Sequence, residues 1–435
     1  MTRPNASGSD STHTCDVLVI GAGIAGVTAA RALVRAGLRV RVLEARQRIG
    51  GRIHTLRDVC DAPVEAGAEL IHSRRAQTWP EVQAAGLTVR PNSHAISAMM
   101  IDLGYGTQSL SRALLHPQTW PSFTILRRLA RREARDTSAS EFLDRHGYRG
   151  RARSLAEMVF TTHLPGSTHE IGIHGFLDDG VLELETSDDY RVNEGYDRVV
   201  EHIARDLEID FGFVAETIEW APDGVLIRAV DGRERAARAA ISTLPAGVLQ
   251  SGAVRFKPEL PETKREALRA MVSGPVLKVI MRFDEPFWPR HLAAVCSSGG
   301  PVALYWNVFY RAGSEAPVLT AYCTGERAAS LARMSEEEAL ATIIADLQRH
   351  FPKAKPKPAS WRLIDWSADP LACGGYTFLR PGAGGARARL AAADSGALFW
   401  AGSETATQPI AATVAGAYVT GLRAASEVAA TPRVR

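Results

Sequence analysis

The chain has 435 residues, of which 46% are hydrophobic and 23% charged, and its formal net charge is +3. This near balance gives no electrostatic reason to expect a nucleic acid or an anionic membrane as partner. No apolar run approaches the roughly 20 residues of a membrane-spanning helix. Residues 1–13 lack the charged-then-apolar pattern of a secretion signal and are expected to form a disordered leader.

The five cysteines are scattered, odd in number and never spaced as C-x-x-C. A disulfide framework and a zinc cluster therefore lack support, and no metal site is predicted. Free thiols in a reducing cytoplasm fit this usage better. Only six of the 51 basic residues are lysine, so a lysine within an apolar segment is easy to notice.

The first predicted elements form a βαβ unit. An apolar, β-branched run at Cys15–Ile20 predicts a buried strand, Val27–Ala36 has the pattern of a helix, and Leu38–Leu43 predicts a second strand. The segment Gly21-Ala-Gly-Ile-Ala-Gly26 directly follows the first strand and opens the helix. Its glycine spacing in this context is typical of a dinucleotide-binding turn.

Each glycine of this turn has a physical role. Gly21 permits the tight turn, Gly23 lets backbone N–H groups approach a pyrophosphate, and Gly26 lets helix and strand pack closely. The N-terminus of the helix adds its dipole and its free N–H groups. Glu44, at the end of the second strand, is placed to bind an adenosine ribose and disfavours a 2′-phosphate, so FAD or NAD is preferred to NADP. The residues predicted to contact the nucleotide here are Gly21, Gly23, Ile24, Ala25, Gly26, Glu44 and Ala45.

Residues 71–191 change in character and predict arginine-rich helices at Ser122–Arg135 and, after a capping signal at Ser138, at Glu141–Arg145. The arginine side of the first of these helices is interpreted as a solvated face. The remainder of the chain alternates between helices and strands without an internal repeat. Helices are predicted at Asn193–Leu207 and Thr413–Ala430, strands at Ala215–Trp220, Gly224–Val230, Ala239–Pro245, Pro275–Phe283, Val318–Thr324 and Ala397–Trp400, and an exposed loop at Lys353–Pro358.

The stretch that follows Glu44 distinguishes FAD from NAD. It contains Arg46, Arg48 and Arg52, which can neutralise a diphosphate, and the pair Gly50-Gly51, which lets the chain pass close to a flat ring. With this opening the chain resembles the flavin-dependent amine oxidase family, which includes monoamine oxidases, polyamine oxidases, histone lysine demethylases and L-amino acid oxidases. The resemblance implies FAD as cofactor.

The resemblance extends over nearly the whole chain. The segments that carry it are Pro63–His72, Ser242–Leu249, Trp366–Tyr376, Phe399–Thr405 and Gly416–Gly421. It implies an α/β fold with a Rossmann-like FAD-binding domain at 14–75, 192–266 and 385–430, and a substrate-binding domain of mixed sheet and helices at 76–191 and 267–384. The further residues that it places on FAD are Arg46, Gly50, Gly51, Arg52, Val214, Gly402, Glu404, Thr413 and Val414.

Lys278 lies in an apolar strand, and lysine is almost never fully buried without a partner. The residues alone favour a side chain that alternates outward to solvent, whereas the resemblance implies the lysine that contacts flavin N5 through a water molecule. The resemblance also makes Trp366 and Tyr376 walls of the amine site. Thr413 stands where a second tyrosine is common, which disfavours small arylalkylamines, and Gly375 stands where covalent members have cysteine, which implies non-covalent FAD.

Two further charged residues are weaker candidates for chemistry. Glu65 could accept a proton or orient a substrate N–H. Arg327 follows a strand expected to face the cavity and could hold a carbonyl or carboxylate by paired hydrogen bonds. A structural or surface charge is an equal alternative for each of them.

The implied reaction is hydride transfer from a carbon–nitrogen centre of an amine or N-acyl amine to flavin, giving an imine, with molecular oxygen reduced to hydrogen peroxide. The arginine-rich chain without a complete small-amine cage suggests bacterial secondary metabolism. In length and overall pattern the chain also resembles members of this family that act on polyketides, and this resemblance implies a large polyketide as substrate and intramolecular capture of the iminium. Polyamine or L-amino acid oxidation with hydrolysis of the imine is an alternative, as are a desaturase or mutase of the same fold and a non-catalytic flavoprotein. A homodimer stays open, and a hydrolase is disfavoured because no G-x-S-x-G motif occurs.

Overall fold

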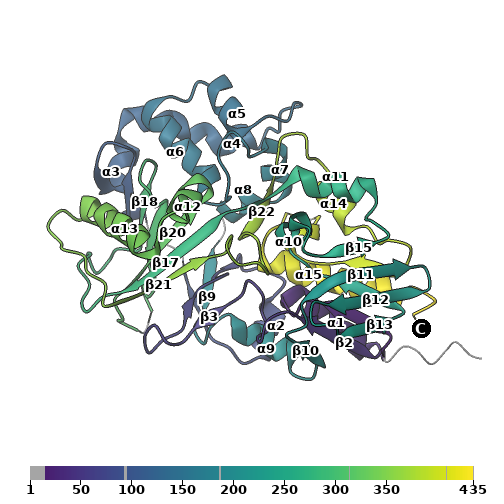
Figure 1. The fold of residues 1–435 in the computed structure, drawn as a ribbon. Helices are drawn as coiled ribbons and strands as arrows, with labels where there is room; N and C mark the ends of the chain where they lie inside the picture. Colours follow the sequence, from purple (N-terminus) through teal and green to yellow (C-terminus); the bar gives the residue numbers. More distant parts are fainter. Residues whose placement is uncertain (1–14, 93–95, 186–187, 313, 408, 435) are drawn as a thin grey trace, which may run out of the picture.

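The computed structural model describes residues 15–92, 96–185, 188–312, 314–407 and 409–434, so the predicted leader lies outside the described residues. Two bodies lie side by side (Figure 1): one contains both the purple N-terminal and the yellow C-terminal segments, and the other is mostly blue and green. No helix among the described residues is both long and apolar enough to cross a bilayer.

The first body is built on a five-stranded parallel sheet. Its spatial order is β10 (Ile209–Phe211), β2 (Val40–Glu44), β1 (Val17–Ile20), β14 (Ala239–Ser242) and β23 (Leu398–Trp400). All four residues of β1 are buried, as expected of a strand that is covered on both faces. The predicted βαβ start of the chain is therefore present, with the parallel pairing of β1 and β2.

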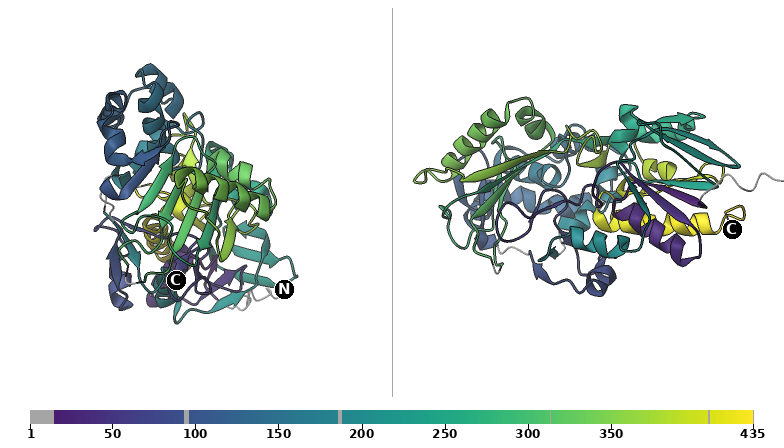
Figure 2. Two further views of the ribbon diagram at one scale, coloured as in Figure 1. Left: turned by 90° about the vertical axis from the view of Figure 1, so that its left-hand side faces the viewer. Right: turned by 60° about the horizontal axis from the view of Figure 1, so that its bottom comes forward.

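Helices cover one face of this sheet and a second sheet covers the other. The covering helices are α1 (Ile24–Arg35), α9 (Asp197–Ala204) and α15 (Val414–Ala429), and the covering sheet contains β11 (Ala215–Ala221), β12 (Gly224–Ala229), β13 (Glu234–Ala237) and β15 (Arg255–Lys257). In the right-hand view of Figure 2, the yellow α15 lies against the purple α1. A Cβ on Gly421 would lie 2.3 Å from the Ala25 carbonyl oxygen, so this close helix contact depends on glycine.

The second body is built on a seven-stranded mixed sheet. Its order is β21 (Ser360–Asp365), β17 (Val276–Arg282), β20 (Val318–Thr324), β19 (Leu304–Asn307), β18 (Ala294–Ser297), β7 (Met99–Asp102) and β8 (Thr107–Ser109). Helices α12 (Gly325–Leu331) and α13 (Glu336–His350) pack on one face. The helical layer beyond the sheet contains α3 (Leu110–Leu115), α5 (Ala139–Arg145), α6 (Gly150–Thr161), α7 (Ile173–Asp178) and α8 (Val181–Glu185).

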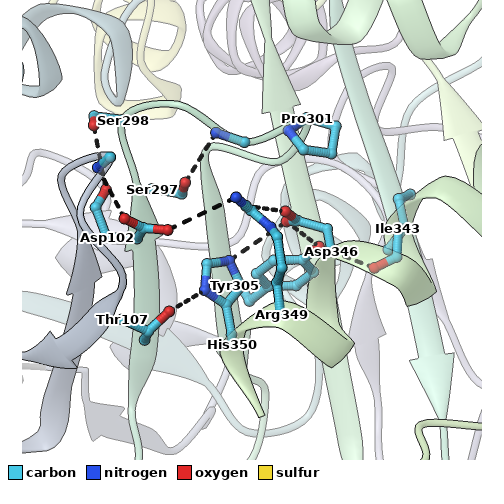
Figure 3. A network of polar contacts seen from close by, with 12 residues as sticks. Asp102, Thr107, Ser297, Ser298, Pro301, Tyr305, Ile343, Asp346, Arg349 and His350 are labelled. Atoms are coloured by element: carbon cyan, nitrogen blue, oxygen red, sulfur yellow. Dashed lines mark hydrogen bonds and ion pairs between the residues drawn. The ribbon is translucent and has the colours of Figure 1, made fainter. Parts of the chain in front are cut away.

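A buried polar network fastens α13 to the far strands of this sheet (Figure 3). The Tyr305 hydroxyl on β19 donates to Asp346 Oδ2 at 2.8 Å, and Asp346 and His350 lie one turn apart on α13. The ring of His350 bonds to the hydroxyl of Thr107 on β8 at 2.6 Å. The two residues next to Tyr305 on β19 point to the opposite side of the strand, where they form part of the wall of the cavity described below. By holding Tyr305 in place, the network therefore also fixes that wall.

Two smaller sheets pack against these layers. The three-stranded sheet β5 (Ile71–His72), β9 (Asp189–Val192) and β6 (Val89–Pro91) contributes to the core of the first body, and the pair β16 (Met271–Gly274) and β22 (Tyr376–Leu379) packs both on the first body and on the helical layer of the second. The remaining short elements are β3 (Thr55–Leu56), β4 (Val64–Glu65), α2 (Trp79–Ala84), α10 (Ala246–Ser251), α11 (Glu262–Ala270), α14 (Ala386–Ala391), and the 3₁₀ turns Ile96–Ala98 and Ser403–Thr405. The predicted division into two discontinuous domains stays a proposal; Val82 of α2, beyond the proposed boundary at 75, joins the core of the first body.

Most predicted elements are present, with ends shifted by a few residues. The helix predicted at Ser122–Arg135 is wrong: a 3₁₀ helix at Pro117–Thr124 is followed by the short α4 at Ile125–Leu129. Pro121 lies inside the 3₁₀ segment, and Arg132 adopts a positive φ of 40°, which stops helical propagation. The helix predicted from Asn193 begins only at Asp197, because Gly195 has φ 101°.

Candidate active site

A cavity of about 960 Å³ extends from the glycine turn of the first body to the sheet of the second. Of the residues predicted from the sequence to form the site, most line this cavity: Gly21, Gly23, Ile24, Ala25, Glu44, Ala45, Arg46, Gly50, Gly51, Arg52, Val214, Lys278, Trp366, Tyr376, Gly402, Thr413 and Val414. Gly26, Glu65, Arg327 and Glu404 do not line it.

The glycine turn shows which glycines the fold itself requires. Gly21 has φ +101°, and a Cβ there would lie 2.5 Å from Thr243 Oγ1. A Cβ on Gly26 would lie 1.9 Å from the Gly21 carbonyl oxygen. Gly23 differs, because its backbone is extended and the nearest atom to a Cβ there is 3.9 Å away. Packing gives no reason for glycine at 23, whereas a ligand that approaches the backbone does, so the turn fits a dinucleotide.

Glu44 ends β2 at the same end of the cavity. Its Oε2 accepts a hydrogen bond from Ala22 N at 2.6 Å, and its Oε1 accepts one from Arg46 N at 2.8 Å. The carboxylate is buried and fixed in place, and each oxygen keeps a lone pair for a further donor. A ribose diol supplies such donors, so Glu44 fits the role that its position in the sequence predicts.

The three arginines after Glu44 are placed differently from one another. Arg46 lines the cavity and pairs with Asp369 at 2.7 Å. Arg52 also lines it, and donates to the Gly375 carbonyl at 2.8 Å and to Glu404 at 2.7 Å. The Arg48 guanidinium instead donates to backbone carbonyls of its own loop and does not line the cavity. Glu404, predicted to bind the cofactor, therefore orients Arg52 rather than facing the cavity.

The N-terminus of α15 also opens into the cavity. Thr413 is the N-cap: its hydroxyl accepts from Gly416 N at 3.0 Å and donates to the Ile410 carbonyl at 2.6 Å. The free N–H groups and the positive end of the dipole suit a ring carbonyl or another electron-rich group. Because the Thr413 side chain caps the helix, it does not act as a second cage wall.

The aromatic walls come from strands β19, β20 and β22 and from Trp366, which directly follows β21. Trp366 is buried and donates its indole N–H to the Ala66 carbonyl at 3.1 Å. The hydroxyls of Tyr376 and Tyr322 are 2.7 Å apart, and Trp306 packs against Tyr322 with ring centroids separated by 5.3 Å. Burial raises the pKa of Tyr376 to about 12, so both phenols stay neutral. Tyr322 and Trp306 were not predicted from the sequence.

Lys278 is buried, although strand alternation alone favoured a solvent-facing position. Its Nζ donates to the Gly67 carbonyl at 2.7 Å and to the Glu65 carbonyl at 3.2 Å, and lies 3.2 Å from Glu69 Oε2. The ammonium also lies over the Trp306 ring, 5.2 Å from its centroid. Burial lowers the pKa of Lys278 to about 7, against the charge of Glu65, which raises it. The amine can therefore gain or lose a proton near neutral pH.

Glu69 and Arg191 are charged cavity residues that the sequence did not indicate. The carboxylate of Glu69 pairs with the guanidinium of Arg191 on one side and with Lys278 on the other. Arg191 Nε donates to Asn92 Oδ1 at 2.7 Å. Its Nη2 has no hydrogen-bond partner within the described part of the chain. Burial lowers the pKa of Arg191 to about 10, so the side chain remains a cation at neutral pH.

The two weaker candidates are placed away from the cavity. Both carboxylate oxygens of Glu65 are bonded, one to the Thr55 hydroxyl at 2.8 Å and the other to Tyr196 N at 2.8 Å. Burial raises the pKa of Glu65 to about 7. Arg327 donates to the Ser297 and Ser298 carbonyls at 2.9 and 2.6 Å. These contacts give Glu65 the role of holding the segment Pro63–His72 in place and Arg327 the role of holding the end of β18, instead of the chemical roles predicted for them.

The far part of the cavity is apolar. A row of facing residues crosses the sheet of the second body in register, from Lys278 on β17 through Tyr322, Leu304 and Cys296 to Ile101 on β7. Helices α3 and α6 close over this row. We call the apolar lobe the set of lining residues Met99, Ile101, Leu110, Leu155, Met158, Cys296 and Leu304.

Comparison with known proteins places the chain in a family. The sequence profile of the flavin-containing amine oxidoreductases matches residues 24–429. The chain belongs to this family. Probable polyamine oxidase 4 of Arabidopsis thaliana is 30% identical over 83% of this chain and 76% of its own length. Lysine-specific histone demethylase 1B of Mus musculus is 27% identical over 96% of this chain, which spans about half (53%) of that demethylase.

Solved structures share the fold. A putrescine oxidase bound to putrescine superposes with a TM-score of 0.82 at 21% identity, covering 95% of this chain and 98% of the other. Cyclohexylamine oxidase from Brevibacterium oxydans gives the same TM-score, identity and coverage. The predicted α/β flavoprotein fold is confirmed, and the chain is a flavin-containing amine oxidoreductase with FAD as its cofactor. No cluster of three or more metal-ligating side chains occurs within the described ranges.

Proposed function

We propose that this family member oxidises the carbon–nitrogen bond of a large amine or N-acyl amine to an imine, with molecular oxygen as the final acceptor. Bound FAD supplies the hydride acceptor, whose reoxidation by oxygen yields hydrogen peroxide. The observation that carries the proposal is the placement of one buried lysine and two neutral phenols at the junction of the dinucleotide half and the apolar lobe.

The residues of the junction have separate tasks. Tyr376 and Tyr322, whose hydroxyls are hydrogen-bonded to each other, form a wall that orients the substrate nitrogen beside the flavin. Trp366 forms a further wall of the site and is held by its hydrogen bond to the Ala66 carbonyl. Lys278 holds a proton at Nζ next to the main-chain carbonyl of Gly67. The surrounding apolar side chains exclude water, which protects the imine and strengthens each polar contact.

The charges of the cavity favour a substrate that is not a linear polycation. Apart from Glu44 at the nucleotide end, each acidic side chain that lines the cavity within the described residues is paired with an arginine or lysine or, for Asp189, hydrogen-bonded to a histidine ring. Glu69 pairs with Arg191 and Lys278, Asp179 with Arg387 at 2.5 Å, Asp188 with Arg74 at 3.2 Å, and Asp189 with His72 at 2.8 Å. A second ammonium group of a diamine would find no free carboxylate and would face the apolar lobe, where an unpaired charge is costly.

The acyl group of an N-acyl amine has a partner in the same cavity. Among the described residues, Nη2 of Arg191 has no acceptor, and a guanidinium edge binds carbonyl oxygen well. This arginine takes over the carbonyl-binding role that the sequence assigned to Arg327. The apolar lobe offers space for the apolar chain attached to such a group, as a polyketide-like substrate of bacterial secondary metabolism requires. We extend the proposal to capture of the iminium within the same molecule.

A substrate panel tests the proposal. The FAD-loaded enzyme is mixed without oxygen with long-chain secondary amines, N-acyl amines, L-amino acids, putrescine and spermidine, and bleaching of the visible flavin bands is followed. Oxygen is then admitted and peroxide is measured. Bleaching by the large amines or N-acyl amines is expected. A flavin that no amine bleaches would overturn the oxidase function, and preferential bleaching by the polyamines would overturn only the substrate class.

Non-covalent attachment of FAD is part of this proposal. A Cβ on Gly375 would lie 2.4 Å from Val276 Cγ2, so the position leaves no space for the cysteine side chain that a covalent link requires. Denaturation followed by filtration is expected to release all the flavin from the polypeptide. Flavin that stays with the protein would contradict this.

A further inference from the structure

Glu69 lies between the two buried cations of the cavity. One of its oxygens pairs with Arg191 and the other is 3.2 Å from Lys278 Nζ, and all three side chains are buried. A buried carboxylate with two cationic partners is held firmly, because removing either partner leaves an uncompensated charge. Both oxygens of Glu69 are thus committed to orienting cations rather than to accepting a substrate proton.

The three hydrogens of the Lys278 ammonium match three acceptors. Two of these are the main-chain carbonyls of Glu65 and Gly67, which are fixed by the fold. The third is Glu69 Oε2, the one charged acceptor among them. The two carbonyls are neutral, whereas the side chain of Glu69 places a negative charge next to Nζ.

We propose that Glu69 is a positioning residue for the oxidation: its carboxylate bridges Lys278 and Arg191, aims the ammonium along the cavity wall and stabilises its protonated form. This inference rests on the function proposed for Lys278 above. It assigns a role to a residue that lies only four positions from Glu65, the carboxylate favoured by the sequence.

The charges around Lys278 show why Glu69 matters. The titratable groups that face it are Glu65 and Glu69 from the segment Pro63–His72, Arg191 from β9 and Tyr322 from β20. Its neighbours Trp306 and Ile364 are uncharged. Burial, with a further contribution from Arg191, lowers the pKa of Lys278, and burial raises the pKa of Glu65 toward neutrality. Without Glu69, Lys278 would face Arg191 with only a partly ionised Glu65 to compensate.

Competitive acylation measures this effect without turnover. Acetic anhydride reacts with the neutral amine, and the chain has only six lysines to resolve by mass spectrometry. In Glu69→Gln, loaded with FAD, the midpoint of Lys278 labelling is expected to move to lower pH by about 1 to 3 pH units. Exposed Lys257 is the internal reference. The matched control is Glu81→Gln, which removes a buried carboxylate paired with Arg31 outside the cavity and should leave the midpoint unchanged.

Two further variants keep the inference testable if Glu69→Gln does not fold. Glu69→Asp retains the charge and should keep a midpoint near the wild-type value. Arg191→Gln removes the opposing cation and should move the midpoint to higher pH. The pH profile of flavin reoxidation should follow the labelling midpoint in every variant.

An unchanged Lys278 midpoint in folded Glu69→Gln, or an equal shift in Glu81→Gln, would overturn the positioning role. Failure of the proposed function is separate and visible: no amine would bleach the flavin in the wild type, whatever the labelling shows.

Discussion

The variant Gly23→Ala should weaken FAD binding without destabilising the apoprotein, and so tests whether glycine at this position serves the cofactor or the fold. The backbone of Gly23, with φ −68° and ψ 170°, is accessible to alanine, and the added Cβ would have no protein atom closer than 3.9 Å. The apoprotein should therefore keep its stability or gain about 0.4 to 1 kcal/mol from the smaller entropy of its unfolded chain. Gly26→Ala is the matched contrast, because its Cβ would lie 1.9 Å from the Gly21 carbonyl oxygen and must destabilise the fold with or without FAD.

FAD binding should respond in the opposite order. The new methyl group occupies the approach of the pyrophosphate to the turn, and each tenfold loss of affinity corresponds to about 1.4 kcal/mol. A ten- to hundredfold weaker Kd would remove about 1.4 to 2.7 kcal/mol of the stabilisation that excess FAD confers. Thermal unfolding of each variant with and without FAD, together with a flavin-fluorescence titration, measures both quantities. Unchanged FAD affinity in Gly23→Ala, or an apoprotein as destabilised as Gly26→Ala, would refute the reasoning.

Three other outcomes are expected. Glu44→Ala should fold but purify with little FAD, since the ribose loses its acceptor; full occupancy measured from the visible spectrum would contradict this. The unfolding temperature of Lys278→Met, relative to that of the wild type, should fall as the pH rises from 6 toward 9. The sign follows because burial lowers the pKa of Lys278 to about 7, so above that pH the folded wild type has lost a proton that the unfolded chain still binds, and the wild type gains stability as the pH rises; a difference independent of pH would count against it. Gly375→Cys should lower the unfolding temperature, and adding Val276→Ala should restore it, because the Cβ at 375 meets the Val276 side chain at 2.4 Å; equal stability of both variants would argue otherwise.

The nucleotide-binding part of the site was predictable because its signals are local. The glycine turn, the strands around it and Glu44 lie within one short stretch, so the backbone path alone brings them together. The family resemblance supplied Lys278 and Tyr376. What neither source supplied was the orientation of side chains within a segment: Glu65 faces Thr55 and Tyr196, whereas Glu69 faces the cavity.

The remaining site residues depend on tertiary pairing. Arg191 reaches the cavity because β9 pairs with β5 and β6, segments about 100 residues earlier in the chain. Tyr322 lies on a strand that was predicted with its correct limits, and its position opposite Lys278 follows only from the register of β17 and β20. Alternation along a strand gives two faces, but the sequence does not say which face meets the cavity.

The most direct test of the account is the ratio of kcat/KM for a long-chain N-acyl amine or secondary amine to that for putrescine, measured in the wild type and in Leu155→Asp. Leu155 lies in the apolar lobe, and the substitution would place there a carboxylate without a basic partner. The account predicts that the wild type prefers the apolar substrate and that the variant shifts the ratio at least tenfold toward putrescine, about 1.4 kcal/mol of discrimination. A wild type that prefers putrescine, with a ratio unmoved by Leu155→Asp, would contradict it.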